Sequence, residues 1–117
     1  MPVRSLNSSV IKWPDGEIVR QALQKWAIEI KRKNSDVVKV GFFGSYARGD
    51  WGVGSDLDIV VVVEKSHHPR ERRAIRFDKE QLPVPADLLV YTLDEWESLS
   101  ASATKFAEVI FREAVWL

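Results

Sequence analysis

Two aspartates separated by a single residue, Asp56 and Asp58, form the pair whose spacing most directly suggests chemistry. They stand at the start of Leu57–Val63, a run that is apolar almost without a break and is typical of a β-strand. Side chains two positions apart in a strand point to the same face, and carboxylates about 4 Å apart repel by about 4 kcal/mol at an effective dielectric constant of about 20. Such a pair takes up a proton or holds a cation between its members. Because the ligands are oxygens only, Mg²⁺ is the natural cation, completed by substrate phosphates and water.

A second chemical feature is the dipeptide Gly44-Ser45, which follows a predicted strand over 37–43 and precedes a short predicted helix. Glycine lets the backbone approach a ligand closely, and the free N–H groups at a helix start attract an anion such as a phosphate. Asp87 is the only acid in a third predicted strand, 84–91, and joins the aspartate pair if that strand lies beside 57–63. A phosphate cradle next to a metal held by carboxylates indicates phosphoryl or nucleotidyl transfer.

Three other motifs are excluded in the same loop. The spacing of Gly44 and Gly49 is similar to that of a phosphate-binding P-loop, but Asp50 and Trp51 follow where that motif needs Lys and then Ser or Thr. The glycines at 52 and 54 precede a strand and lack the third glycine of a dinucleotide-binding turn. The aspartate pair also lacks the third oxygen ligand and the glycine of a calcium-binding EF-hand loop.

The hydrophobic pattern predicts the first elements that position these residues. Asp15 is an expected helix N-cap, and two adjacent apolar rows between 18 and 30, the first of them led by Ile18, predict an amphipathic helix with a left-handed cap at Asn34. In the strand over 37–43, Val38, Val40 and Phe42 should share one face. The strand over 57–63 should be covered on both faces and therefore lie in the centre of the sheet.

The remaining elements are also predicted from local signals. A polar, arginine-rich segment over 69–81 is expected to be helical, and Thr92 begins a capping box for a helix through about Leu99. A last helix is expected over 103–113, with one side formed by Phe106, Val109, Ile110 and Ala114. The order of elements predicts an α/β fold, in which a single domain over 1–117 contains a small mixed β-sheet flanked by helices. Residues 1–9 are expected to be loose.

Composition limits the classes of function. The chain has 117 residues, 17 basic and 17 acidic side chains, and no cysteine. Zero net charge disfavours a dedicated nucleic-acid-binding domain, and it makes a stable partner or a homo-oligomer more favourable because colloidal repulsion is weak. The absence of cysteine excludes a disulfide framework, and no apolar run is long enough for a membrane span. A cytoplasmic protein is the expectation.

The pattern Gly44-Ser45, ten residues, then Asp56-Leu57-Asp58 resembles the signature of the DNA polymerase β-like nucleotidyltransferase superfamily. The short length of the chain and the sequence Gly44-Ser45-Tyr46-Ala47-Arg48-Gly49 most resemble the minimal nucleotidyltransferase branch of this superfamily. The resemblance covers about residues 18 to 91 and extends more loosely to Leu117.

This resemblance implies a function and a role for each matching residue. Gly44 and Ser45 would hold the β- and γ-phosphates of ATP, while Asp56 and Asp58 would bind Mg²⁺, as two ions in such enzymes. Asp87 would complete the metal site and help to deprotonate the attacking hydroxyl, and the enzyme would transfer AMP and release pyrophosphate. Two further loop residues are candidates for phosphate contacts, namely Arg48 and Ser55.

The resemblance also implies a partner, because minimal nucleotidyltransferases are typically paired with helical HEPN proteins as toxin–antitoxin modules. In that pairing the enzyme would act as the antitoxin by adenylylating a tyrosine of the HEPN toxin. The apolar sequence Ala114-Val115-Trp116-Leu117 is interpreted as an end that a partner covers. The alternatives are a stoichiometric nucleotide- or partner-binding protein without catalysis, and an enzyme that modifies a small molecule.

Three features outside the motif have less specific interpretations. Four arginines are expected to form a solvated helix face: Arg70, Arg72, Arg73 and Arg76. Two of them, Arg72 and Arg76, share one side of such a helix and could meet an acidic partner. His67 and His68 are interpreted as part of a turn, and Trp51 as a residue that stacks on a base, covers a partner's surface or packs internally.

Overall fold

The computed structural model describes residues 13–117, so the predicted loose segment 1–9 lies outside the described residues. Its helical segments are α2 (Gly16–Lys33), α3 (Ser45–Arg48), α4 (Arg70–Arg73), the 3₁₀ turn η1 (Ala74–Arg76), α5 (Leu93–Ser100) and α6 (Lys105–Glu113). Its strands are β1 (Val37–Phe43), β2 (Leu57–Val63), β3 (Ala86–Thr92) and β4 (Val115–Trp116).

The four strands form one mixed sheet in the order β3-β2-β1-β4. The strands β1 and β2 are antiparallel, whereas β2 and β3 are parallel. The central position predicted for β2 is confirmed, since it pairs on both sides and six of its seven residues are buried. The predicted α/β class with a small mixed sheet is likewise confirmed.

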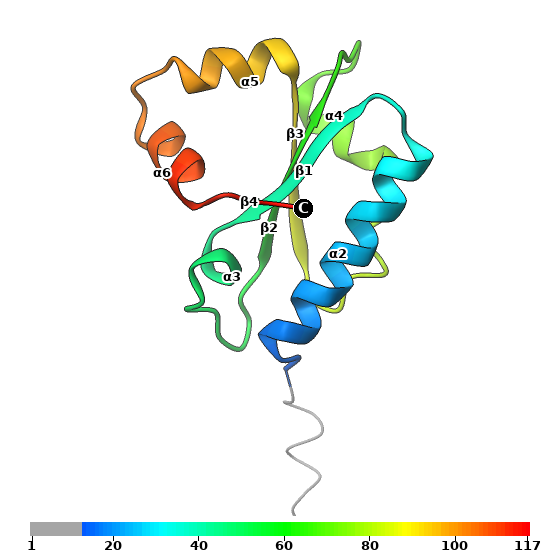
Figure 1. Cartoon of the computed structure of the whole chain (residues 1–117), viewed down its shortest axis with the longest axis vertical. Helices are drawn as coiled ribbons and strands as arrows, with labels where there is room; N and C mark the ends of the chain where they lie inside the picture. Colours follow the sequence, from blue (N-terminus) through cyan, green and yellow to red (C-terminus); the bar gives the residue numbers. More distant parts are fainter. Residues whose placement is uncertain (1–12) are drawn as a thin grey trace, which may run out of the picture.

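Helices cover both faces of the sheet, with α2 on one side and α5 and α6 on the other (Figure 1). The alternation of β2 divides its side chains between two hydrophobic clusters. Leu57, Ile59 and Val61 belong to the cluster that includes the buried side of α2. Val60 and Val62 belong to the second cluster, with Trp96 of α5 and Ile110 of α6. By the same alternation Asp56 and Asp58 lie on the α5–α6 face of β2.

The helix α2 agrees with the prediction except at its C-terminal cap. Asp15 is the N-cap, and its carboxylate accepts a hydrogen bond from the Glu17 amide. Asn34 is extended, with φ −132°, and is not left-handed. Its side-chain amide and its backbone N–H both donate to the Ile30 carbonyl, at 2.9 and 3.0 Å, and this satisfies the helix end without a left-handed turn. Ile18, placed in the apolar row by the sequence, is 55% exposed.

Two predictions about the sheet and its connections are wrong. Val38 does not share the buried face of Val40 and Phe42, because the register shifts between Val37 and Lys39 and leaves it as an extra, exposed residue. The segment 69–81 is not one helix, since only 70–76 are helical, as α4 and η1. Phe77 is extended and buried, and the indole of Trp26 donates to the Asp78 carbonyl, so tertiary contacts remove this stretch from the helix.

The C-terminal elements differ from the prediction in detail. The capping box at Thr92 is confirmed. The last helix begins at Lys105, with Thr104 as its N-cap, and it buries Ala107 and Ile110 while Phe106 is 40% exposed.

The apolar end does not project as a free surface, because it forms the edge strand β4 beside β1. A Cβ on Gly41 would lie 2.5 Å from the Trp116 ring, and the Leu117 amide donates to the Val40 carbonyl at 2.9 Å. Val115 and Trp116 remain 39% and 40% exposed. Among the described residues, the structure contains no helix that is both long and apolar enough to cross a membrane.

Candidate functional site

The strand register brings the predicted carboxylates together. Asp58 is the second residue of β2 and lies opposite Asp87, the second residue of β3. Asp56 precedes β2 by one position and shares the face of Asp58 by alternation. On its other side, Asp58 lies opposite Phe43 of β1, and Gly44 follows directly. Residues far apart in the sequence therefore meet at one end of the sheet.

Gly44 is in contact with the central carboxylate. It has φ +80°, and a Cβ built on it would lie 2.3 Å from Oδ2 of Asp58. Gly44 is also the N-cap residue of α3, where no side chain caps the helix. A glycine is required here both by the backbone conformation and by the close approach of Asp58. The first turn of α3, which begins at Ser45, is thereby fixed beside the carboxylate.

The central carboxylate of the site, that of Asp58, is partly buried and lies close to other negative charges. Burial raises the pKa of Asp58, and the neighbouring charges of Asp87 and Asp56 raise this pKa further. Arg48 opposes this effect and lowers the pKa, but it does not cancel the others. Asp56 and Asp87 are exposed, while Asp58 is half-buried between them. The arrangement favours a proton or a cation at Asp58.

The other two predicted phosphate-contacting residues have partners of their own. Arg48 donates from Nε to Asp50 at 3.0 Å and from a terminal nitrogen to Glu113 at 3.1 Å. This guanidinium therefore links α3 to α6 beside the carboxylates. The hydroxyl of Ser55 accepts a hydrogen bond from the Gly52 amide at 2.8 Å, which closes the turn before Asp56. A phosphate contact by Arg48 or Ser55 stays a prediction.

The sequence interpretation missed the residues that position α3. Tyr46 is buried, its hydroxyl accepts from the indole N–H of Trp13 at 2.9 Å, and its carbonyl accepts from Arg20 at 2.8 Å. Trp51 stacks on the Tyr46 ring, with the centroids 5.6 Å apart and the planes 6° apart. Of the roles considered for Trp51, the structure shows internal packing. The aromatic residues at 46 and 51, within an otherwise small and polar loop, were the available signal.

The carboxylates of Asp56, Asp58 and Asp87 are suitable ligands for a hard divalent cation, although the three do not lie close enough together to surround one. Within residues 13–117, no group of three His, Asp or Glu side chains is gathered closely enough to hold a metal. Carboxylate oxygens are the ligands that Mg²⁺ prefers, and no softer ligand lies among the three.

In this α/β protein with a mixed sheet, Asp58 and Asp87 lie opposite each other on neighbouring strands, Asp56 directly precedes β2, and the turn that begins at Gly44 lies beside them. The family model for the nucleotidyltransferase domain matches residues 23–117, which include every predicted site residue. The chain therefore belongs to the nucleotidyltransferase domain family. A search of curated proteins gave no significant match.

Two solved structures are similar to this fold. One is a crystal structure of a protein from Sulfolobus solfataricus assigned as a nucleotidyltransferase; it has a TM-score of 0.62 and 20% identity, and the match covers 86% of this chain and 80% of that one. The other is a toxin–antitoxin complex with AMP-PNP, with a TM-score of 0.48 and 17% identity, and the match covers 82% of this chain and 69% of that one. The first supports the fold, and the second is too distant to support an argument.

Proposed function

We propose that this chain is a Mg²⁺-dependent nucleotidyltransferase that transfers AMP from ATP to a hydroxyl group. The observation that supports the proposal is the register that sets Asp58 opposite Asp87, with Gly44 against the Asp58 carboxylate. This register sets Asp58 and Asp87 beside a helix turn whose N-cap, Gly44, provides no side-chain cap. A cluster of acids alone repels a nucleoside triphosphate, so the arrangement becomes useful only with a cation between acids and phosphates.

Each residue has a proposed role in the reaction. Asp56, Asp58 and Asp87 would hold Mg²⁺, which when bound neutralises phosphate charge and polarises the α-phosphate. The backbone at Gly44 and the side chain of Ser45 would bind the β- and γ-phosphates. Asp87 would accept the proton of the acceptor hydroxyl as its oxygen bonds to the α-phosphorus. The bond from the α-phosphorus to the bridging oxygen breaks, and pyrophosphate leaves.

The acceptor is proposed to be a tyrosine of a HEPN toxin, which would make this chain an antitoxin. The proposal rests on the resemblance to minimal nucleotidyltransferases in the motif from Gly44 to Asp58.

The catalytic proposal is tested by label transfer from α-³²P-ATP to the co-purified partner protein in the presence of Mg²⁺. Asp58→Asn should lower transfer by orders of magnitude, because it removes a negative ligand while the shape is kept. Asp94→Asn, an exposed aspartate in the first turn of α5, removes the same charge and should leave the rate unchanged. Equal rates for wild type and Asp58→Asn would overturn the metal assignment.

The role of Asp87 has a separate test. Asp87→Asn should bind ATP as wild type does and transfer AMP slowly, because the lost step is activation of the hydroxyl. Loss of nucleotide binding with an unchanged rate constant for bound substrate would contradict this role.

The alternative function, inhibition by binding alone, is distinguished in cells. If the Asp58→Asn protein relieves the partner's toxicity as well as wild type does, the protein is a stoichiometric binder. If no co-encoded protein is modified and a small hydroxyl compound is labelled instead, the acceptor assignment is wrong while the nucleotidyltransferase assignment holds.

A further inference from the structure

Helix α6 lies beside the candidate site and is connected to it at both of its ends. Near the C-terminal end of the helix, Glu113 accepts a hydrogen bond from Arg48 of α3 at 3.1 Å. Near the N-terminal end, the Phe106 ring is edge-on to the Phe43 ring, with the centroids 6.2 Å apart and the planes at 84°. Positions 106 and 113 are about two turns apart, so both side chains lie on one face of α6. This face of the helix therefore borders the site.

The contact with Phe43 brings Phe106 close to the central carboxylate. Phe43 lies opposite Asp58 in the strand register. Such cross-strand partners point to the same face of a sheet, with their Cβ atoms about 5 Å apart. Because the centroid of the Phe106 ring is a further 6.2 Å from that of Phe43, the ring and the Asp58 carboxylate are on the order of 10 Å apart. A base that is joined through a ribose to an α-phosphate at Asp58 extends over a distance of this order.

Phe106 is also accessible to a ligand, since it is 40% exposed. Phe111 and Trp116 are exposed to a similar degree, but both rings contact Trp96, with centroids 4.6 and 5.5 Å from it. Trp51, which the sequence suggested as a residue that stacks on a base, packs internally. Within the described part of the chain, Phe106 is therefore the exposed aromatic ring that is connected to the site.

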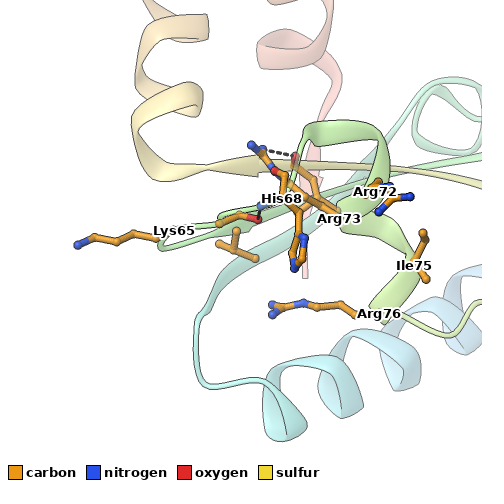
Figure 2. A pocket seen from close by; sticks show the side chains of 9 residues that line it. Lys65, His68, Arg72, Arg73, Ile75 and Arg76 are labelled. Carbon is orange, nitrogen blue, oxygen red and sulfur yellow. Dashed lines mark hydrogen bonds between the residues drawn. The ribbon is translucent and has the colours of Figure 1, made fainter.

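A cavity at the opposite end of the sheet is not an alternative place for the base. Its volume is about 320 Å³, and it is lined by Val63, which is five residues and about 17 Å along β2 from Asp58. Figure 2 shows that Lys65 and Arg72 at this cavity point away from each other. The other two arginines that line it are already paired with carboxylates. The cavity is therefore too distant from the aspartates, and it presents no converging cations.

We propose that Phe106 stacks on the base of the nucleotide that the site binds. This inference rests on the proposed function, because the phosphates must lie at Gly44 and the aspartates for the base to reach α6. Stacking uses the face of a base, so it adds affinity for any nucleotide beyond that of its phosphates and selects little among the bases. The edge-on contact with Phe43 occupies at most one face of the Phe106 ring, which leaves the other face for the base.

The test measures ligand binding to the full chain in the presence of Mg²⁺ by isothermal titration calorimetry. One ligand is α,β-methylene-ATP, which cannot transfer AMP, and the other is tripolyphosphate, which has a chain of three phosphates without a base. Each ligand is compared between wild type and variant, because the charges of the two ligands differ. Phe106→Ala should weaken binding of the nucleotide at least about fivefold and change binding of tripolyphosphate less than about twofold.

Matched variants complete the test. Phe111→Ala removes the same side chain from the same helix at nearly equal exposure, 42%, and should change nucleotide binding less than about twofold because its ring contacts Trp96 and not Phe43. Phe106→Trp keeps an aromatic face and should bind the nucleotide within about twofold of wild type. Phe106→Leu keeps apolar volume without an aromatic face and should also weaken nucleotide binding, and it replaces Phe106→Ala if thermal melting shows that the alanine variant does not fold.

Failure of this inference and failure of the proposed function give different results. If wild type binds neither ligand in Mg²⁺, the proposed function is overturned and the inference with it. If wild type binds both ligands and Phe106→Ala weakens both equally or neither, only the stacking role is overturned. Equal weakening of nucleotide binding by Phe106→Ala and Phe111→Ala would also overturn it, since it would indicate a general effect on α6. Unchanged nucleotide binding with a loss of label transfer to the partner protein would assign Phe106 to the acceptor instead.

Discussion

At the scale of single residues, the site depends on one close contact between a backbone and a carboxylate. Gly44 directly follows β1 and Asp58 lies on the neighbouring strand β2, and no side chain larger than hydrogen fits between them. The same chain provides a comparison, because Gly49 also has positive φ, +89°, with nothing within 4 Å of its added Cβ. Substitutions at the two glycines therefore distinguish the effect of backbone strain from the effect of displacing the Asp58 carboxylate.

We expect Gly44→Ala to abolish nucleotidyl transfer and to destabilise the fold by about 2–4 kcal/mol, because strain and a displaced Asp58 add together. Gly49→Ala should lower stability by about 1 kcal/mol from strain alone and retain most of the activity. Urea unfolding and label transfer on both variants measure the difference. Similar activity in the two variants would show that the Asp58 position is unimportant.

A second residue-scale prediction concerns the charge on Asp58. Its pKa is raised above the ordinary 3.8, so the folded state binds the proton more tightly than the unfolded state does. Folding stability is therefore lost as pH rises from about 3.8 through the raised pKa, and it is regained as pH falls through the same range.

Asp58→Asn lacks this titration. In EDTA the variant should match wild type near pH 3 and become the more stable protein towards pH 7. Thermal melts across this pH range measure it. A wild-type protein that stays the more stable one at pH 7 in EDTA would contradict an unfavourable charge on Asp58, whether it arises from burial or from the neighbouring aspartates.

At the scale of elements, α4 and α5 are connected by the ion pair of Arg73 with Glu95, which is the most buried ion pair among the described residues. Arg73 donates to both carboxylate oxygens of Glu95, at 2.5 and 3.0 Å, and Glu95 also accepts from the Thr92 amide in the capping box. The solvated helix face expected from the sequence is therefore wrong for Arg73, whose side chain is 10% exposed. Its hydrogen bonds lower the pKa of Glu95 from 4.5 to about 2.

Arg73→Gln should destabilise the protein by about 1–3 kcal/mol at pH 7, since a partly buried carboxylate loses its partner. The contribution is fully present above pH 4.5 and is lost as pH falls towards 2, so the deficit of the variant should shrink over that range. Arg32→Gln breaks an exposed pair with Glu29 and should leave unfolding unchanged. Chemical denaturation at pH 7 and pH 3 distinguishes the two cases.

The sequence predicts those elements whose pattern is local. The apolar rows of α2, the continuous run of β2 and the capping box of α5 are each complete within one segment, and all three elements are confirmed, although Ile18 of the first row is exposed. The strand β4 could not be predicted, because two residues become a strand only through pairing with β1. The break after Arg76 also depends on distant contacts, such as that of Trp26 with Asp78.

The same distinction applies to the site. Gly44, Asp56 and Asp58 lie within 15 residues of one another in the sequence, so a local motif contains them. Asp87 joins them only because β3 pairs with β2, which the sequence analysis had to assume. Trp13 and Arg20 hold α3 through hydrogen bonds to Tyr46, and they precede it by 33 and 26 residues in the sequence. No local sequence pattern encodes these contacts.

At the scale of the whole molecule, acidic side chains of the candidate site gather at one end of the sheet, where Asp58 lies opposite Asp87. The zero net charge of the chain conceals this local group of acids. A cation bound together with a nucleotide is therefore expected to stabilise the protein at this end.

Mg²⁺ with a non-hydrolysable ATP analogue should raise the melting temperature of the wild-type protein. At a ligand concentration about a hundred times the dissociation constant, the free energy of unfolding should increase by about 2.7 kcal/mol. Asp58→Asn should lose this gain, whereas Asp94→Asn should keep it. Scanning calorimetry with and without EDTA measures it. An equal gain in both variants would place the nucleotide elsewhere.

The negative charge around Asp58 has a consequence for how this protein would evolve under selection for stability alone. A library of random variants selected only for resistance to heat, without magnesium, would enrich neutral residues at positions 56, 58 and 87. Such survivors would keep the fold and lose the reaction, because proteins commonly give up stability where activity needs unfavourable charge. Neutral residues at these three positions in a natural descendant would mark a protein retained for what it binds.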